Sequence, residues 1–580
     1  MAPPLGSRFS GLPRSRQPRM VALPTLGRNS KIKVRMSRLR FFPLLLLLGV
    51  TSGISTTLAA TDPDQACAHC HQKIFDSYQK TPMARASGAA IDGLLPGEFT
   101  HAASGVHYQL FLRDGRAWLS YDRSNASPDR ALKGEQELSY FIGSGQRGRT
   151  YLFQKHGYWF ESPVNWYSKQ RVWDMNPKSL DAREMPFTLK VDGGCLHCHS
   201  TGVQPSLGAV NHFGAQPFLY GGITCRSCHG DPAAHLKTGG TAPILNPAKL
   251  SPAKRDSVCL QCHLEGETAV NAPGRSLAAF VPGQDLLEYV THFVHSGELG
   301  PEGRATSQWE ALLQSECKKK SGDRLTCTTC HDPHNSPSAE ERVSYFRSRC
   351  LTCHGASAFV SKHHPEQPDC IGCHMPREKT GDVAHEQVTD HRIQRRPAPS
   401  SSQLQARTGD LSLVGGGKAS DRDLGLAYFQ MANHGDQAAG NRAMQLLKQA
   451  ERQRGEPPDP DLHTALGFMA HLSGDRQTAI REYEAALEAN PADSVAAGDL
   501  AILEARAGNA KSAINRLQGI SENDPGEIGA GIDLAMIECA VRDPQAATTA
   551  LRHLLEFSPD DAKARNILAA IETKPETCQH

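Results

Sequence analysis

The sequence has no strong excess of charge of either sign and few cysteines for its length. Its 63 Lys and Arg residues nearly balance 61 Asp and Glu residues, which argues against a general nucleic-acid binder. The 17 cysteines among 580 residues fall well below the roughly 8–10% cysteine of disulfide-scaffold proteins. An apolar fraction of 39% and a charged fraction of 21% exclude wholesale disorder and a polytopic membrane protein. At roughly 150 residues per domain, the length predicts three or four domains.

The sequence also lacks an apolar run long enough to cross a membrane. Residues 41–50 form an unbroken apolar run, about half of the roughly 20 residues that a span requires. A basic segment precedes the run, and small residues ending at Ala60 follow it, which is the three-part layout of a secretory signal peptide. We therefore predict a signal in residues 1–60, cleaved near residue 60, with translation beginning at Met36. Retention of the segment as a membrane anchor is the alternative.

The net charge of +2 belongs to this N-terminal segment. Residues 1–40 carry ten Lys or Arg residues and no acid, so without them 53 basic and 61 acidic residues remain, a balance of −8. A partner with a basic docking face is therefore expected. The signal predicts a periplasmic or otherwise exported bacterial protein that is not an integral membrane protein after cleavage, with peripheral membrane association left open.

Fourteen of the cysteines fall into one motif, Cys-x-x-Cys-His, which occurs seven times, where composition alone would give roughly 0.02 matches. Two thiols three positions apart can bond to the two vinyl groups of one haem, and the next residue then offers an imidazole to the iron as proximal ligand. Zinc is the alternative for paired cysteines, but zinc does not require a histidine after each pair. We number the sites 1 to 7 along the chain: Cys67, Cys70 and His71; Cys195, Cys198 and His199; Cys225, Cys228 and His229; Cys259, Cys262 and His263; Cys327, Cys330 and His331; Cys350, Cys353 and His354; Cys370, Cys373 and His374.

Four short segments around these motifs carry a family resemblance. They read CHGDPAAH at 228–235, CTTCHDPHN at 327–335, CHMPR at 373–377 and TDHRI at 389–393. These segments resemble the multihaem cytochrome c superfamily, which includes tetrahaem electron carriers of ammonia oxidisers and pentahaem nitrite reductases. The resemblance covers roughly residues 61–393. It implies seven covalently attached c haems, with their iron, packed into one core.

In that superfamily a histidine shortly after one attachment site commonly ligates the iron of a neighbouring haem. Fourteen further histidines precede residue 400, enough for seven distal positions. The resemblance implies that the distal ligands come from His235, His334, His385 and His391, then from His363 or His364 and from His292 or His295. At site 1, Met83 stands where many relatives place a distal histidine, and it is either an axial thioether or a core residue.

Residues 98–191 contain no attachment motif and differ from their flanks. Alternating apolar runs surround Asp114-Gly115 and His156-Gly157, which predicts two hairpins in a small β insert. Four of the five tryptophans lie in this segment and are expected in its core, with a docking surface as the alternative.

Cys317 lies outside the motifs and is followed by Lys318, Lys319 and Lys320. We predict a buried structural cysteine next to a solvated lysine turn. A ligand or redox-active thiol and an anion-attracting patch are the alternatives.

The C-terminal part repeats with a period of 34 residues. Prolines at 491, 525 and 559, alanines at 479, 513 and 547, and leucines at 466, 500 and 534 keep this spacing. The period is that of the tetratricopeptide repeat, a helix pair that stacks into a superhelix. A looser copy is expected at 424–459 and a capping helix at 562–573. We predict that the repeats dock a redox partner; a spacer or a dimerisation module is the alternative.

Together these features predict a multidomain, mainly α protein. A haem-packed core with a β insert at about 98–191 would occupy residues 61–393, followed by a linker at 394–420 and an α-solenoid at 421–575. The expected function is electron transfer by hopping between covalently bound haems. A multihaem reductase of a small nitrogen or sulfur oxyanion, with one open haem iron, is the alternative. Against it, the sequence has no Cys-x-x-Cys-Lys motif, the variant that marks the catalytic haem of the pentahaem nitrite reductases.

Overall fold

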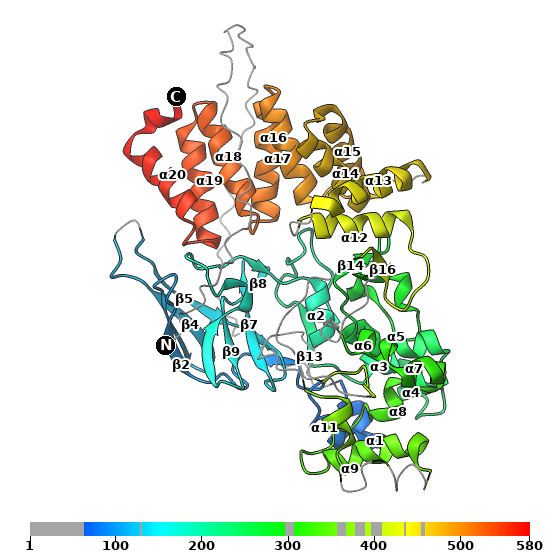
Figure 1. Cartoon of the computed structure of the whole chain (residues 1–580). Coiled ribbons are helices and arrows are strands. Elements are labelled where there is room, and N and C mark those ends of the chain that lie inside the picture. The colour runs from blue at the N-terminus through cyan, green and yellow to red at the C-terminus, as the bar shows by residue number, and fades with distance from the viewer. Residues whose placement is uncertain are drawn as a thin grey trace, which may run out of the picture. The chain divides into compact units, whose positions relative to one another are not determined.

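The computed structural model describes residues 63–127, 130–295, 307–356, 363, 367–377, 389–395, 409–433, 437–453 and 459–579. The described residues all belong to one compact unit, Asp62–His580 (Figure 1). The predicted signal segment, part of the predicted linker, His364 and His385 lie outside the described residues.

A four-stranded antiparallel sheet follows site 1 in the sequence. Its strands, in spatial order, are β2 (Gly97–Thr100), β3 (His107–Arg113), β4 (Arg116–Asp122) and β5 (Lys133–Leu138). Buried and more exposed residues alternate along β4, because one face of the sheet packs on a core. The β3–β4 turn places Asp114 and Gly115 at positive φ (52° and 71°), as a type I′ hairpin turn requires. The predicted hairpin at these two residues is confirmed.

A seven-stranded antiparallel sheet packs against the first. Its strands are β1 (Ser87–Ala89), β6 (Tyr140–Ile142), β7 (Gly148–Lys155), β8 (Tyr158–Glu161) and β11 (Leu189–Lys190), with β9 (Val164–Tyr167) and β10 (Val172–Met175) joined through β7. The β7–β8 turn at His156 and Gly157 confirms the second predicted hairpin. Tyr108, Phe153 and Phe160 are almost fully buried in the shared core. Trp159 and Trp173 are buried as well, so these two tryptophans are core residues.

The strand-rich region coincides with the predicted β insert at about 98–191, and the two small sheets after it depart from the predicted mainly α core. Antiparallel strands dominate residues 87–190, because short runs of alternating polarity between turn residues favour sheets over helices. Two further small sheets follow: β12 (Ser200–Val203) with β13 (Phe218–Gly221), and β14 (Thr268–Asn271) with β15 (Val290–His295) and β16 (Leu411–Leu413).

The helices between residues 65 and 374 are short. They are α1 (Gln65–Tyr78), α2 (Gly193–His199), α3 (Arg226–His229), α4 (Ala233–Lys237), α5 (Pro252–His263), α6 (Gln308–Gln314), α7 (Glu316–Ser321), α8 (Cys327–Cys330), α9 (Arg342–His354) and α11 (Cys370–His374), with single turns of 3-10 helix at Pro177–Ser179, Pro247–Lys249, Leu277–Ala279, Leu286–Glu288 and Gly322–Arg324. Seven of these ten α-helices contain an attachment motif or most of one. The chain is therefore built here around its motifs, in pieces too short to be stable alone.

The C-terminal part is a tetratricopeptide-repeat domain of consecutive helix pairs (Figure 1). We call this domain the array. Its helices are α12 (Asp421–Asn433), α13 (Gln437–Gln453), α14 (Pro460–Ser473), α15 (Arg476–Ala489), α16 (Ser494–Arg506), α17 (Ala510–Asn523), α18 (Ile528–Ala540), α19 (Pro544–Phe557) and α20 (Ala562–Thr573), before a 3-10 turn at Pro575–Gln579. The helix α20 confirms the predicted capping helix.

Small side chains let paired helices of the array approach closely. The periodic alanines Ala479, Ala513 and Ala547 are fully buried. A Cβ on Gly467 would lie 2.7 Å from the Tyr483 ring, so the helices α14 and α15 need glycine at this position. The periodic residues are therefore packing residues.

Buried charged side chains connect the array to the strand-rich region. Arg123 pairs with Asp560, and the Asp560 carboxylate also accepts a hydrogen bond from the Met185 backbone N–H at 2.8 Å. The two paired side chains are 7% and 2% exposed. Nearby, Lys190 contacts Asp524 at 2.9 Å, and Phe557 packs into the aromatic core. The array therefore makes an integral contact with the strand-rich region and is not a freely attached tail.

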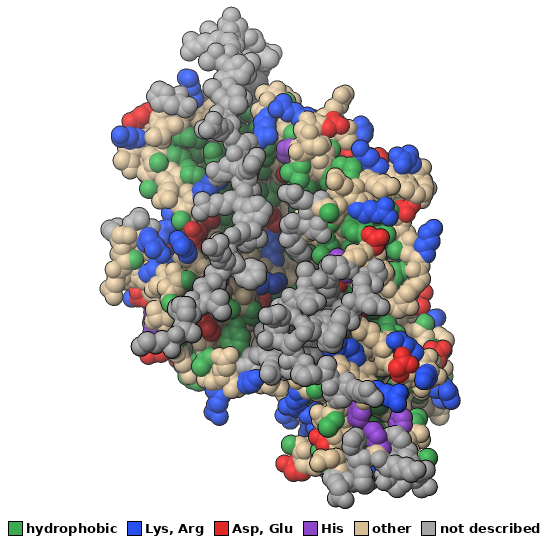
Figure 2. Space-filling view, viewed as in Figure 1, with side chains coloured by type: hydrophobic (Ala, Val, Ile, Leu, Met, Phe, Trp, Pro, Cys, Tyr) green, Lys and Arg blue, Asp and Glu red, His purple; other side chains and the backbone are tan. Residues whose placement is uncertain are grey.

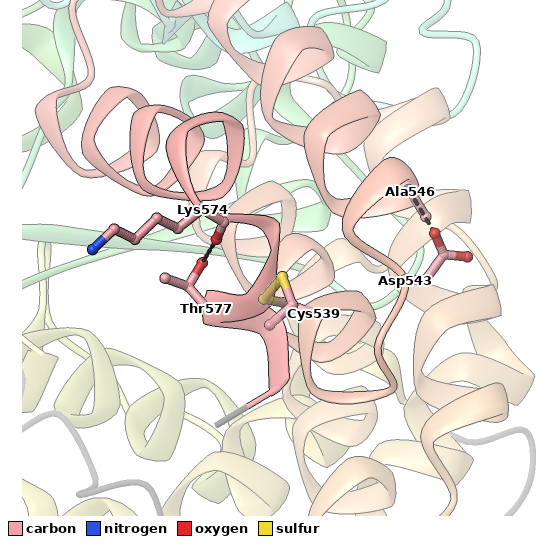
Figure 3. Close-up of a disulfide and its surroundings, with 6 residues drawn as sticks. Cys539, Asp543, Ala546, Lys574 and Thr577 are labelled. Atoms are coloured by element: carbon pink, nitrogen blue, oxygen red, sulfur yellow. Dashed lines mark hydrogen bonds between the residues drawn. A yellow bond between two sulfur atoms is a disulfide. The ribbon is translucent and has the colours of Figure 1, made fainter.

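Cys539 and Cys578 form a disulfide that ties α18 to the C-terminal turn (Figure 3). Sequence reasoning gave these two cysteines no role. Among the described residues, no helix is long and apolar enough to span a membrane.

Candidate haem sites

Each attachment motif occupies one turn of helix. Sites 1, 2, 4, 6 and 7 lie within α1, α2, α5, α9 and α11, while α3 and α8 hold most of sites 3 and 5. The spacing i, i+3 places both thiols of a motif on one face of its helix. Both thiols can therefore reach one edge of the same bound group.

Aspartate side chains cap two of these helices, α2 and α11. The Asp192 carboxylate accepts a hydrogen bond from the Cys195 N–H at 2.8 Å at site 2. The Asp369 carboxylate accepts one from the Gly372 N–H at 2.9 Å at site 7. Such caps satisfy donors that a short helix leaves without partners. They also orient the attachment cysteines before any group is bound.

The attachment helices bury little protein surface of their own. No residue of α3, α8, α9 or α11 is buried, although α9 has 13 residues. The attachment cysteines share this exposure: none of the fourteen is buried, whereas unmodified cysteine is among the most buried residue types. An apolar porphyrin would supply the surface that these helices do not find in protein. The site composition therefore fits covalently bound haem.

Surrounding protein still desolvates several thiols that retain exposed surface. Cys195 is exposed, yet burial among its neighbours and the charge of Asp192 raise the pKa of its thiol to about 12. Burial likewise raises the pKa of Cys228 to about 11. These thiols are surrounded by protein atoms but keep some solvent-exposed surface. Residues that line the binding site of a large group would have the same surroundings.

Thiols from different motifs lie against one another. Pairing with Cys198, followed by burial, raises the pKa of Cys262 well above its usual value. Four such pairs join sites 1 and 3, 2 and 4, 4 and 5, and 6 and 7: Cys67 with Cys225, Cys198 with Cys262, Cys259 with Cys327, and Cys350 with Cys370.

Weaker electrostatic interactions between thiols link the remaining neighbouring sites. Cys228 interacts with Cys262, which links sites 3 and 4, and Cys330 interacts with Cys353, which links sites 5 and 6. All seven motifs therefore form one continuous group, with site 2 as a branch from site 4.

Three proximal histidines face a second histidine at a spacing suited to a shared metal. The ring centroids are 6.0 Å apart for His229 and His334, 6.3 Å for His331 and His391, and 5.8 Å for His363 and His374. The ring planes of each pair lie within 25° of parallel. Two imidazoles bound to one metal at about 2 Å per nitrogen have centroids roughly 6 Å apart. The spacing of these pairs therefore matches two axial ligands of one iron.

Backbone carbonyls orient four of these candidate ligands. The Nδ1 atoms of His229, His235, His374 and His391 lie 2.8, 2.7, 2.6 and 2.7 Å from carbonyl oxygens of Leu245, Ala242, Gln394 and Thr389. A carbonyl only accepts, so each Nδ1 carries the proton and each Nε2 is left as the metal-binding nitrogen.

The remaining candidates occupy different surroundings. His292 is buried in β15, where desolvation lowers its pKa to about 4, and its Nδ1 has no hydrogen-bond partner among the described residues. His295 on the same strand contacts Glu267 through Nδ1 at 2.6 Å. Neither is paired with a proximal histidine in the part of the chain that the structure describes. Met83 is partly buried, and its carbonyl accepts from the Ile223 N–H at 2.9 Å.

The Cys317 segment differs from its prediction. Cys317 is only partly buried and interacts electrostatically with Cys353, so it lies among the attachment thiols of sites 5 and 6. Lys318 is buried; its ammonium donates to the Leu325 carbonyl at 3.0 Å and lies 5.0 Å from the centre of the Trp309 ring. The predicted solvated lysine turn is therefore wrong for Lys318, because the side chain closes the next turn of the chain.

Figure 2 shows histidine side chains gathered at the surface close to α9 and α11. His354 and His363 are exposed there, and His374 is partly exposed.

Asp64 is a residue of the site that sequence reasoning missed. It immediately precedes α1, which suggests a cap for that helix, but its side chain makes no cap hydrogen bond there. Its two carboxylate oxygens instead accept from the Cys225 N–H at 3.0 and 3.1 Å. No local sequence signal points to a contact across 161 positions.

Two family models match parts of the chain. The cytochrome c554 and c-prime model matches residues 165–230, which contain sites 2 and 3. The tetratricopeptide-repeat model matches residues 470–531. The search of curated proteins finds no match.

Several solved structures are similar to part of the chain. The Cut9–Hcn1 hetero-tetramer of APC/C has 21% identity over 25% of this chain and 29% of that one, with a TM-score of 0.22. The MamA RS-1 ArsTM double mutant has 16% identity over 28% of this chain and 89% of that one, with a TM-score of 0.24. YrrB, described as a TPR protein with an unusual peptide-binding site, has 20% identity over 24% and 72%, with a TM-score of 0.22. The chain therefore combines a stretch similar to the cytochrome c554 and c-prime family with a C-terminal tetratricopeptide-repeat domain.

Proposed function

We propose that this protein is an exported c-type cytochrome that holds seven covalent haems and carries electrons among them. The observation that carries the proposal is the set of three histidine pairs with ring centroids 5.8–6.3 Å apart, each including the histidine of an attachment motif. A bound c haem supplies reversible one-electron chemistry at its iron, with a potential set by its ligands and surroundings.

The residues divide into tethers and ligands. The fourteen motif cysteines tether the haems, and the seven motif histidines are the proximal ligands. His334, His391 and His363 are the distal ligands at sites 3, 5 and 7, because each faces the proximal histidine of that site. His235, with its Nδ1 held by a carbonyl, is proposed as a distal ligand at another site, together with His292 or His295, His385 and His364.

The contacts between motifs support transfer within the protein. Every motif has a thiol that touches or interacts with a thiol of another motif. Haems tethered at such thiols would have neighbouring edges. The chain itself contributes to this order by capping helices α2 and α11 and by orienting the imidazoles.

Histidine pairing favours a carrier over the reductase alternative at sites 3, 5 and 7. An iron with two imidazole ligands has no open position for a substrate. The same residues that hold the haem would therefore exclude small oxyanions from these irons.

The array is proposed to dock a redox partner. Tetratricopeptide repeats generally bind proteins, and the array already binds the strand-rich region through the ends of its helices near Asp524 and Asp560. The side chains of the array that lie away from this contact would bind the partner. A periplasmic or otherwise exported location is supported by the sequence of residues 36–60 and by the Cys539–Cys578 disulfide, since such bonds persist in oxidising compartments.

Intact mass measurement tests the haem content. The mature protein should carry seven haem increments beyond its polypeptide mass, starting near residue 60. Replacing both Cys350 and Cys353 by Ala should remove one increment. Cys317→Ala, a matched change at a nearby cysteine outside the motifs, should keep all seven. A protein purified from its exported fraction with no haem, or with zinc at the motifs, would contradict the proposal.

A further inference from the structure

The contact between Asp64 and site 3 suggests a role that rests on the proposed function and goes beyond it. Asp64 is 3% exposed and is the last residue before α1. An aspartate in this position usually caps its own helix, but here both carboxylate oxygens accept from the backbone N–H of Cys225. The residue that precedes the site 1 helix therefore holds the first residue of site 3.

Two further hydrogen bonds join the same two segments, the site 1 helix with the chain after it and the segment just before Cys225. We call this contact region the junction. The Tyr78 hydroxyl, at the end of α1, donates to the Ile223 carbonyl, and the Ile223 N–H donates to the Met83 carbonyl at 2.9 Å. The segment just before the site 3 cysteines is thus fixed by the helix of site 1 and by the chain that follows it. Asp64 is the charged member of the junction.

The carboxylate also lies beside the tethers of two haems. One oxygen of Asp64 and the sulfur atoms of Cys67 and Cys225 lie within 4.8 Å of one another. With both sulfurs tethered, this group offers no ordinary metal site, because its thiolates are used. What would remain is one buried carboxylate beside the tethers of both haems.

We propose that Asp64 is a positioning residue shared by sites 1 and 3, which fixes the site 3 helix and lowers the reduction potentials of both haems. A negative charge stabilises the oxidised form of a nearby haem, which carries one more positive charge than the reduced form. The effect is strong where water does not screen the charge. Asp64 therefore makes the haems at this junction weaker electron acceptors than they would be without it.

Spectroelectrochemical titration of the haem-loaded protein tests the proposal. Asp64→Asn keeps an oxygen that can accept from the Cys225 N–H but removes the charge, so two of the midpoint potentials should rise while the haem mass stays unchanged. Asp64→Ala removes the acceptor as well and should also lower haem occupancy at site 3. The matched control is Asp76→Asn, which removes an equal charge from the exposed face of α1 and should leave every potential in place.

The outcomes separate this inference from the proposed function. Haem content of the unchanged protein reports on the function alone. A titration of Asp64→Asn that superimposes on that of the unchanged protein would overturn the inference. A shift of equal size in Asp76→Asn would also overturn it, since the effect would then be one of overall charge. Loss of haem from Asp64→Asn with unchanged remaining potentials would contradict the electrostatic role.

Discussion

The array and the attachment region are both built from helices, but they are stabilised by different partners. Helix α16 of the array buries five of its 13 residues: Ala496, Ala497, Leu500, Ala501 and Leu503. Helix α9 of the attachment region has the same length and buries none. A helix of this length is marginal in water unless one face packs. The array is therefore specified by its own side chains, whereas we propose that the attachment region needs haems as part of its core.

The largest expected effect comes from withholding haem. Full-length protein made without haem attachment should lose hydrogen-exchange protection in α9 and α11, because these helices have no buried side chains to hold them. Helices α16 and α18 should stay protected. The haem-loaded protein is the control, and protection should appear in α9 there. Equal protection of α9 in both forms would contradict the proposal that the attachment region depends on haem while the array does not.

The next largest effect tests the contact between the array and the strand-rich region. Asp560→Ala leaves the Arg123 guanidinium buried without its carboxylate, and breaking a buried pair costs about 3–5 kcal/mol of unfolding free energy. Glu556→Gln, at the exposed contact with His156, should cost less than about 1 kcal/mol. Chemical denaturation of the haem-loaded protein measures both. Equal losses would show that the buried pair does not fasten the array.

A smaller effect tests the close packing inside the array. Gly467→Ala should cost about 1–3 kcal/mol, because the added methyl meets the Tyr483 ring at 2.7 Å. Gly519→Ala, in the middle of α17 with no atom within 4 Å of the new Cβ, should instead gain about 0.5–1 kcal/mol. Thermal unfolding followed by far-ultraviolet circular dichroism checks both signs. A stable Gly467→Ala protein would argue against a tight α14–α15 contact.

The smallest expected effect on the molecule comes from removing one distal ligand. His334→Ala should convert one haem of seven from low spin to high spin, with the fold retained, because the His229 iron loses its second imidazole. His107→Ala, on β3 beside Thr100, is the control and should leave the spectrum unchanged. Electron paramagnetic resonance measures the two spin states. An unchanged spectrum of His334→Ala would show that His334 is not the distal ligand at site 3.

The features that could be predicted from the sequence are those with a local or periodic signal. The 34-residue spacing indicated the array, because one helix pair per repeat must present the same packing residues. The Asp114-Gly115 and His156-Gly157 turns were predictable, because positive φ at two positions favours those residue types. The seven motifs were visible because the proposed covalent attachment of haem requires a fixed spacing of two cysteines and a histidine.

The features that could not be predicted depend on contacts between distant segments. The pairing of His331 with His391 joins positions 60 residues apart, and nothing in either local sequence selects the other. The same holds for Asp64 with Cys225 and for Arg123 with Asp560. The small sheets outside the predicted β insert, β12 with β13 and β14 with β15 and β16, were not predicted, because most of their strands are only three or four residues long. Such strands carry too few residues for a period of two to be recognised.

The central claim, a chain of haems ligated by two histidines each, is tested most directly by the spin state of the fully oxidised protein. The account predicts low-spin, six-coordinate haem at sites 3, 5 and 7 and, for a pure carrier, throughout the protein, with no spectral change on adding nitrite, hydroxylamine or cyanide. A substantial high-spin component that shifts on adding one of these ligands would contradict the carrier function and favour a reductase.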